Sequence, residues 1–141
     1  MSLDILLLLY KTLFQPFLTY GLEVWGSTYH THLNTILITQ KLIARIITFS
    51  DFTAPSAPIF NQLKILDTFK LHTFLLCTFV FDLVHGNVPH TLATRQNIRG
   101  DLIAPKVKLS QGKFAFSYLA VKKWNNLVIT TCRDNTDGFR L

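Results

Sequence analysis

Hydrophobic residues recur with helical spacing along most of this chain. Residues 3–20 are apolar on nearly every side, which predicts a buried helix that Pro16 either kinks or divides in two. Residues 33–49 carry apolar side chains at i, i+3, i+4 and i+7, the spacing of one face of an amphipathic helix. Thr31 is the expected N-cap of that helix.

The middle of the chain predicts a loop followed by two more helices. Residues 50–58 contain two prolines and small polar residues, which are typical of a loop, and a short helix is expected over 59–63. Residues 67–85 form a second strong helical pattern, with Asp67 as its cap and Gly86 as its terminator. Because its apolar residues occur on every side, we expect this helix at the centre of a bundle.

The last third of the chain is less regular. Residues 91–112 show no clear period, and the sequence allows a short β-hairpin near 102–110. Residues 113–127 fit both a strand and a helix, although the longer pattern favours the helix. The polar tail after Thr131 is expected to fray.

These elements predict a mainly α protein, an irregular helical bundle. At 141 residues the chain is long enough to bury a real core. We expect a helical bundle over residues 1–90, a basic segment over 91–130 that packs on it, and a frayed tail over 131–141.

Composition changes this picture in one respect. Hydrophobic residues make up 49% of the chain and charged residues only 16%, below the roughly 25% that is usual in soluble domains. So low a content of charged residues indicates an apolar surface whose binding partner has been lost.

The positive charge is concentrated in one stretch. The net charge is +6, and the window from residue 95 to 123 accounts for it with seven basic residues against Asp101. An interaction face for an anionic partner and a merely solvated lysine-rich surface both fit this clustering. Lys41 and Arg45 lie one turn apart on the helix over 33–49, where they can line the same groove. The basic residues of the window are Arg95, Arg99, Lys106, Lys108, Lys113, Lys122 and Lys123.

Aromatic residues are interleaved with these bases. Exposed rings could stack on nucleobases, as in proteins that bind single strands. At helical spacing, however, Phe114 and Trp124 fit a protein core better than a binding surface. The aromatic residues of the window are Phe114, Phe116, Tyr118 and Trp124.

No pattern in the sequence predicts catalysis, a metal site or a cofactor. The histidines and cysteines lack zinc-ligand spacing, no nucleophile elbow or phosphate-binding glycine loop is present, and no two acidic residues are adjacent. We therefore expect no enzyme activity and no small-molecule substrate.

The cysteines and the N-terminus indicate an intracellular protein of the cytoplasm or nucleus. Cys77 and Cys132 are too few for a disulfide framework, and Cys77 fits a small core residue in a reducing compartment. The apolar run near the N-terminus lacks a basic flank and includes Asp4, so we expect no signal peptide. No run reaches the roughly 18 to 20 apolar residues of a membrane span.

One block carries information beyond composition. Residues 15–26 read QPFLTYGLEVWG, and physically they are a helix interrupted at Pro16 and stopped near Gly21 or Gly26. In its order of residues the block resembles the segment after the polymerase palm in reverse transcriptases of LINE-type (non-LTR, jockey-like) retrotransposons.

Further blocks match that family in the same order, so that the resemblance spans about residues 6–127. It departs at Ala120-Val121, where the family usually has Gly-Pro, and the histidine expected near Thr53 is out of register. The matching positions are Thr31, Leu33, Asn34, Gln40, Lys41, Arg45, Ile46, Ile47, Ala57 to Phe60, Lys64 to Leu66, Val88-Pro89, Thr94-Arg95, Gly112-Lys113, Tyr118, Trp124-Asn125 and Leu127.

The resemblance implies a helical thumb and post-thumb region that grips a template–primer duplex of RNA and DNA. It also implies that the palm, with the paired aspartates that hold two catalytic metal ions, is missing, so the chain is expected to be a fragment without catalysis. Phosphate contacts would come from the seven basic residues of the window, with Lys41 and Arg45 added, and binding is expected to be weak and non-specific. An intact polymerase domain is a further expected partner.

Two alternatives remain from the sequence. A membrane-surface protein fits the low charge content, although a membrane partner is not expected, and it predicts lipid partitioning that persists in high salt. A protein-interaction module with an exposed apolar face predicts aggregation or partnering when the chain is expressed alone.

Overall fold

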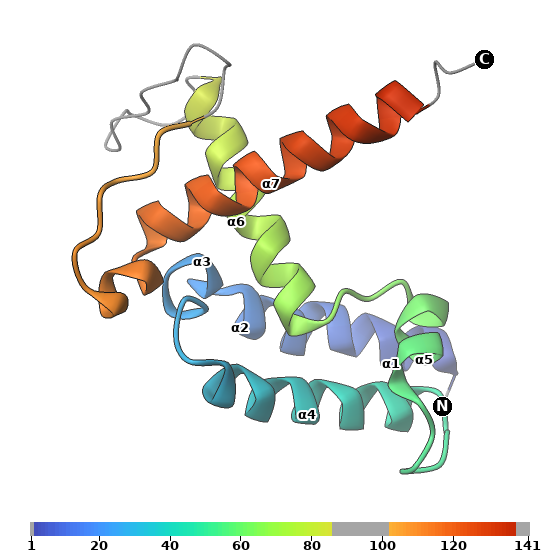
Figure 1. The fold of residues 1–141 in the computed structure, drawn as a ribbon. Helices are drawn as coiled ribbons and strands as arrows, with labels where there is room; N and C mark the ends of the chain where they lie inside the picture. The colour runs from blue at the N-terminus through green and yellow to red at the C-terminus, as the bar shows by residue number, and fades with distance from the viewer. Residues whose placement is uncertain (1, 86–101, 138–141) are drawn as a thin grey trace. The chain divides into compact units, whose positions relative to one another are not determined.

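The computed structural model describes residues 2–85 and 102–137, and within them the chain is mainly helical, as predicted (Figure 1). Contacts divide the chain into two units, unit 1 over residues Met1–His72 and unit 2 over Thr73–Leu141. The division falls within one helix, α6 (Thr68–Val84). The boundary expected at residue 90 lies outside the described residues.

Unit 1 begins with a helical rod that changes its winding before a proline. It consists of α1 (Leu3–Leu9), a π-helical turn, η1 (Tyr10–Phe14), and α2 (Gln15–Thr19). Pro16 has no N–H for the carbonyl of Thr12 and its ring crowds the preceding turn, so the wider turn stands where an α-helix would clash. The predicted interruption at Pro16 is confirmed.

Two glycines then set the ends of the short helix α3 (Leu22–Trp25). Gly21 takes a left-handed conformation with φ +65°, which a glycine adopts without steric cost. A Cβ on Gly26 would lie 2.4 Å from the carbonyl oxygen of Leu22 and 2.7 Å from a ring carbon of His72. Backbone conformation at Gly21 and close contacts at Gly26 therefore favour glycine at both positions, and the predicted helix stops are confirmed.

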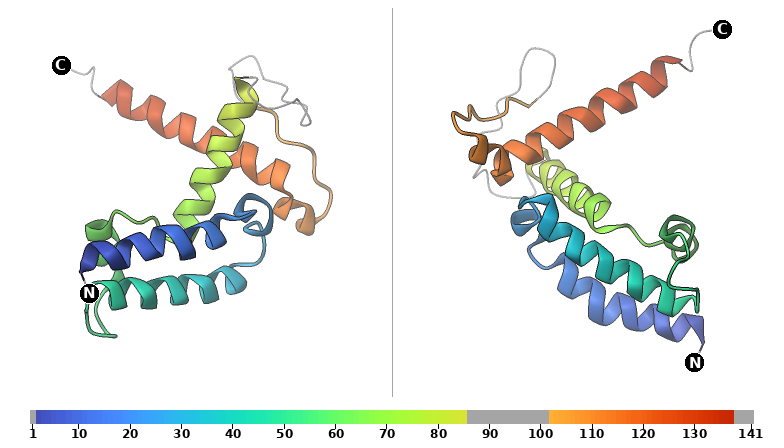
Figure 2. Two further views of the ribbon diagram at one scale, coloured as in Figure 1. Left: turned by 180° about the vertical axis from the view of Figure 1, so that it is seen from behind. Right: turned by 60° about the horizontal axis from the view of Figure 1, so that its bottom comes forward.

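The next helix, α4 (His30–Ile47), lies alongside the rod of α1 and α2 and runs in the opposite direction (Figures 1 and 2). Its N-cap is Tyr29, with no side-chain cap hydrogen bond. The prediction of Thr31 as the cap is wrong, because the helix begins at His30 and Thr31 already lies inside the first turn.

A short helix closes one end of unit 1. α5 (Ser56–Leu63) begins earlier than the expected 59–63, because Pro58 lies in the first turn, where its missing N–H costs no helical hydrogen bond. Lys64, in a left-handed conformation with φ 54°, ends it. The core that joins the rod, α4 and α5 consists of Tyr10, Ala44, Ile47, Ile59, Phe60 and Leu63.

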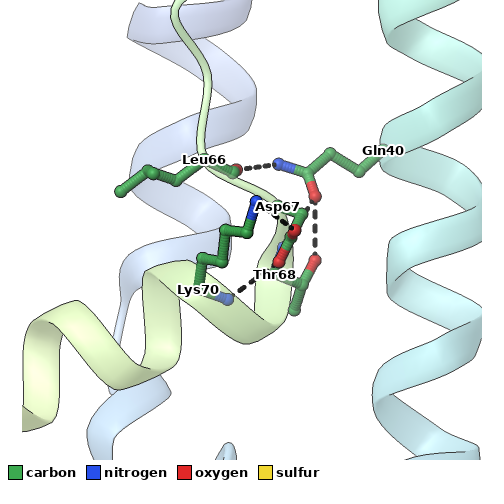
Figure 3. A network of polar contacts seen from close by, with 5 residues as sticks. All are labelled: Gln40, Leu66, Asp67, Thr68 and Lys70. Carbon is green, nitrogen blue, oxygen red and sulfur yellow. Dashed lines mark hydrogen bonds and ion pairs between the residues drawn. The ribbon is translucent and has the colours of Figure 1, made fainter. Parts of the chain in front are cut away.

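A buried amide links the rod and α4 to the segment that leads into α6. Gln40 is completely buried, and its Nε2 donates to the hydroxyl of Tyr10 at 2.9 Å and to the carbonyl of Leu66 at 2.8 Å. Its Oε1 accepts from the N–H and the hydroxyl of Thr68, both at 3.0 Å (Figure 3). Because every donor and acceptor of the amide is used, its burial carries no unsatisfied polar group.

The start of α6 (Thr68–Val84) is capped as predicted. The carboxylate of Asp67 accepts from the backbone N–H of Lys70 at 2.8 Å, which satisfies one of the free donors of the first turn (Figure 3). The same carboxylate forms an ion pair with the ammonium of Lys70 at 3.7 Å. The terminator expected at Gly86 lies outside the described residues.

Unit 2 packs the second part of α6 against α7 (Phe116–Asp137), which follows a 3₁₀ turn, η2 (Ser110–Phe114). The helix favoured for residues 113–127 is thus present from Phe116 onward. Where a frayed tail was expected from residue 131, α7 continues to Asp137. The core consists of Leu76, Val80, Leu102, Ala120 and Val121.

The hairpin that the sequence allowed near 102–110 is absent. Residues 103–108 form neither helix nor paired strand in the described part of the chain. The side chain of Asn125 on α7 bonds to both backbone groups of Leu102, donating to its carbonyl at 2.8 Å and accepting from its N–H at 3.1 Å. One side-chain amide therefore satisfies the backbone polar groups of Leu102.

Candidate nucleic-acid interface

Five of the predicted basic residues lie in the described part of unit 2, and all five are exposed. Lys106 and Lys108 are on the extended segment, Lys113 is in η2, and Lys122 and Lys123 are on α7. Among the described residues none of the five forms an ion pair. Asp82 is the one acidic residue among the described side chains of unit 2, so the charge of this region is strongly positive.

Two contacts hold these lysines on one framework. Asn125 ties the start of the extended segment to α7, and the side chain of Leu102 is buried in the core with 4% exposure. Further along, a Cβ on Gly112 would lie 2.1 Å from Cγ1 of Val107, so only a glycine lets η2 approach the segment this closely. Val107 stands between Lys106 and Lys108, and Gly112 precedes Lys113, so these three lysines come from neighbouring stretches of backbone.

The remaining predicted basic residues belong to unit 1 or lie outside the described residues. Lys41 and Arg45 lie on α4 in unit 1, where both are half-buried. Nε of Arg45 donates to the carbonyl of Ala54 at 3.0 Å, a bond that holds the loop between α4 and α5. Arg95 and Arg99 lie outside the described residues.

The aromatic side chains of the basic window divide between core and surface. Phe116 packs edge-on against Phe79, with ring centroids 4.9 Å apart, and joins the core of unit 2. Trp124 also packs against that core, whereas Phe114 is 38% exposed. The core interpretation is therefore confirmed for Trp124 and wrong for Phe114, and Phe116 joins the core as well.

Sequence analysis missed two rings at the end of α6. Phe81 is 47% exposed, and the imidazole of His85 stacks on its ring with centroids 4.0 Å apart. The signal was available, because an aromatic residue and a histidine four positions apart share a helix face. It was obscured by the apolar residues on every side of this helix.

The two described side chains with a clearly shifted pKa, Cys77 and Tyr10, do not point to catalysis. Burial raises the pKa of the Cys77 thiol, although the positive charge of Lys123 nearby acts in the opposite direction. Burial likewise raises the pKa of Tyr10, partly offset by its hydrogen bond from Gln40. A protonated thiol is a poor nucleophile, so Cys77 has the character of a structural residue.

Two further features are absent from the described residues. They contain no cluster of three or more histidine, cysteine, aspartate or glutamate side chains that could hold a metal ion. No helix among them is both long enough and apolar enough to cross a membrane.

An apolar pocket of about 430 Å³ lies in unit 1. The polar groups of two lining residues are already used. The indole N–H of Trp25 donates to the backbone carbonyl of Tyr20 at 2.8 Å, and the hydroxyl of Thr39 donates to the backbone carbonyl of Thr35 at 3.2 Å. The pocket therefore offers apolar contact with little to orient a polar ligand. Its lining residues are Phe14, Phe17, Leu18, Trp25, Ile36 and Thr39.

Comparison with protein families, with curated proteins and with solved structures gives no match for this chain.

Proposed function

We propose that unit 2 binds the phosphate backbone of nucleic acid. The observation that carries this proposal is the group of five exposed lysines on one framework, with a single acidic residue among the described side chains around them. Lysine ammonium groups neutralise phosphates and release condensed counterions, which needs no base-specific contact. Binding of this kind is weak and independent of sequence.

We further propose that the chain is a thumb-like C-terminal fragment of a LINE-type reverse transcriptase, with a template–primer duplex as the ancestral ligand. The ordered blocks of the sequence support this origin, because they extend over most of the chain. No pair of adjacent acidic residues is present to hold two metal ions, so the proposed role is binding without catalysis.

A salt titration tests the proposed binding. Affinity of the full chain for a primer–template duplex is measured by fluorescence anisotropy from low to moderate salt. Each phosphate contact contributes about 0.9 to the slope of log affinity against log salt, so several lysine contacts predict a steep fall. An affinity that is undetectable at low salt, or independent of salt, contradicts the proposal.

A protein-interaction module is the second candidate, and the exposed apolar side chains of unit 1 favour it. Phe17 is 83% exposed, Leu13 69% and Ile38 65%, and large apolar side chains that gather on a surface mark interaction sites. Sedimentation velocity of the purified chain tests this candidate. Association that rises with protein concentration and disappears in Phe17→Ser supports it, whereas a monomer at all concentrations contradicts it.

A further inference from the structure

The exposed end of α6 carries a row of side chains one helical turn apart. Cys77, Phe81 and His85 follow one another at intervals of four residues and therefore share a face of the helix. The rings of Phe81 and His85 are stacked with centroids 4.0 Å apart and planes 29° apart. Nδ1 of His85 lies 2.8 Å from the carbonyl oxygen of Phe81, and since a carbonyl only accepts, this nitrogen carries the proton. The imidazole of His85 is thus held both by the stack and by a hydrogen bond.

Two residues of α7 lie beside this row. The ring of Trp124 is 6.5 Å from that of Phe81 and tilted by 53°. Lys123 directly precedes Trp124 on α7 and is exposed, and its positive charge acts on the Cys77 thiol. A cation and three aromatic rings are therefore neighbours within unit 2.

Exposure separates this row from the core of the same helix. Val80 and Leu83 are buried, with 2% and 1% exposure, whereas Phe81 is 47% exposed and His85 is exposed. A large ring that stays in water forgoes the stabilisation of burial, and a pre-formed stack of such rings beside lysines is the combination that binds unpaired nucleotides.

We infer that the exposed rings of Phe81 and His85, with the half-buried ring of Trp124 beside them, form a stacking platform for an unpaired nucleobase, and that Lys123 contacts a phosphate of the same strand. This inference rests on the proposed nucleic-acid binding and extends it from the duplex backbone to single-stranded nucleic acid. Stacking uses the face of the base, which every base has, so the platform does not select a sequence.

Fluorescence of Trp124 gives a direct test. In the full chain with Trp25→Phe, Trp124 is the one remaining tryptophan, and addition of a short oligothymidine should quench its emission as a base stacks on the platform. A strand that carries 2-aminopurine should show the reciprocal quenching of the base. Binding without any change in either emission overturns the inference.

Affinity of variants separates stacking from charge. Phe81→Leu and His85→Ala keep the lysines, and each should weaken binding of single-stranded DNA roughly tenfold while binding of a blunt duplex changes little. Phe52→Leu is the matched control, because Phe52 is an exposed ring in unit 1, 74% accessible, and it should bind as the wild type does. Thermal unfolding of each variant shows that the fold is retained.

The outcomes distinguish the two proposals. If Phe81→Leu and His85→Ala bind single strands as well as the wild type, while lysine substitutions weaken binding, the platform is wrong and the phosphate-binding function stands. An equal loss in Phe52→Leu also overturns the platform. If the wild-type chain binds neither duplex nor single strand at low salt, the proposed function itself fails.

Discussion

In unit 1 the key polar side chains bind other parts of the protein, whereas the lysines in the described part of unit 2 are exposed and form no ion pair there. The amide of Gln40 is completely buried in four hydrogen bonds, Arg45 holds a loop carbonyl and Lys70 pairs with Asp67. In unit 2, one amide, that of Asn125, organises the backbone, and the five lysines around it are exposed. Arg45 and Lys70 of unit 1 therefore support the fold, whereas the five lysines of unit 2 are exposed on a backbone that Asn125 organises.

The largest expected effect is on the stability of unit 1. Gln40→Leu removes four hydrogen bonds and leaves the hydroxyl of Tyr10, the carbonyl of Leu66 and the N–H of Thr68 without their buried partner. Since each stranded group costs about 1–3 kcal/mol, urea denaturation should show a loss of roughly 3 kcal/mol or more.

Gln62→Leu is the control, because it is the same substitution at an exposed position of α5 and should change stability by less than about 0.5 kcal/mol. Equal stability of the two variants would show that the buried amide does not hold unit 1 together.

A smaller effect is expected in unit 2. Asn125→Leu removes both hydrogen bonds to Leu102 and should lower stability by about 1–3 kcal/mol in urea denaturation. Nucleic-acid affinity should fall as well, because the segment that carries Lys106 and Lys108 loses its attachment to α7. Gln111→Ala, an exposed residue of η2, should change neither quantity. If the free energy of unfolding falls but nucleic-acid affinity does not change, the attachment of this segment to α7 is not needed for binding.

The smallest effect concerns alkaline pH. Burial raises the pKa of Cys77 above its ordinary 9.0 and that of Tyr10 above its ordinary 10.0. As pH rises, the unfolded chain loses these protons first, so the native state holds more protons and the free energy of unfolding falls. Cys77→Ala should remove the part of this fall that begins near pH 9, and Tyr10→Phe the part that begins near pH 10.

Urea denaturation at a series of pH values measures the free energy of unfolding of both variants. Cys132→Ala is the control for the second thiol. A free energy of unfolding that rises with pH across this range would contradict the assigned direction of both pKa shifts.

Helical periodicity was sufficient to predict most of the fold. The interruption at Pro16, the stops at Gly21 and Gly26, and the cap at Asp67 follow from local chemistry, and the structure has all of them. The hairpin near 102–110 was wrong because its replacement is a contact across 23 residues of sequence, between Leu102 and Asn125, which no local pattern reveals. The buried hydrogen bonds of Gln40 could not be predicted for the same reason, since its partners are 26 to 30 residues away in the sequence.

The candidate site was predicted in part. The clustering of lysines was visible as charge along the chain, and exposure of five of them agrees with that pattern. Their arrangement was not visible, because it depends on Gly112 packing against Val107 and on the amide of Asn125. Ala120 and Val121, which directly precede Lys122 and Lys123, are buried in the core of unit 2.

The measurement that tests the central claim most directly compares matched lysine variants of the two units. One variant of the full chain carries Lys106→Gln, Lys108→Gln and Lys113→Gln, and the other carries Lys11→Gln, Lys64→Gln and Lys70→Gln, so both lose the same charge. The salt dependence of primer–template affinity is then measured for each. Loss of the unit 2 lysines should lower affinity and reduce the slope by up to about 2.7, whereas loss of the unit 1 lysines should leave the slope near that of the wild type. Equal slopes for the two variants would contradict a binding surface confined to unit 2.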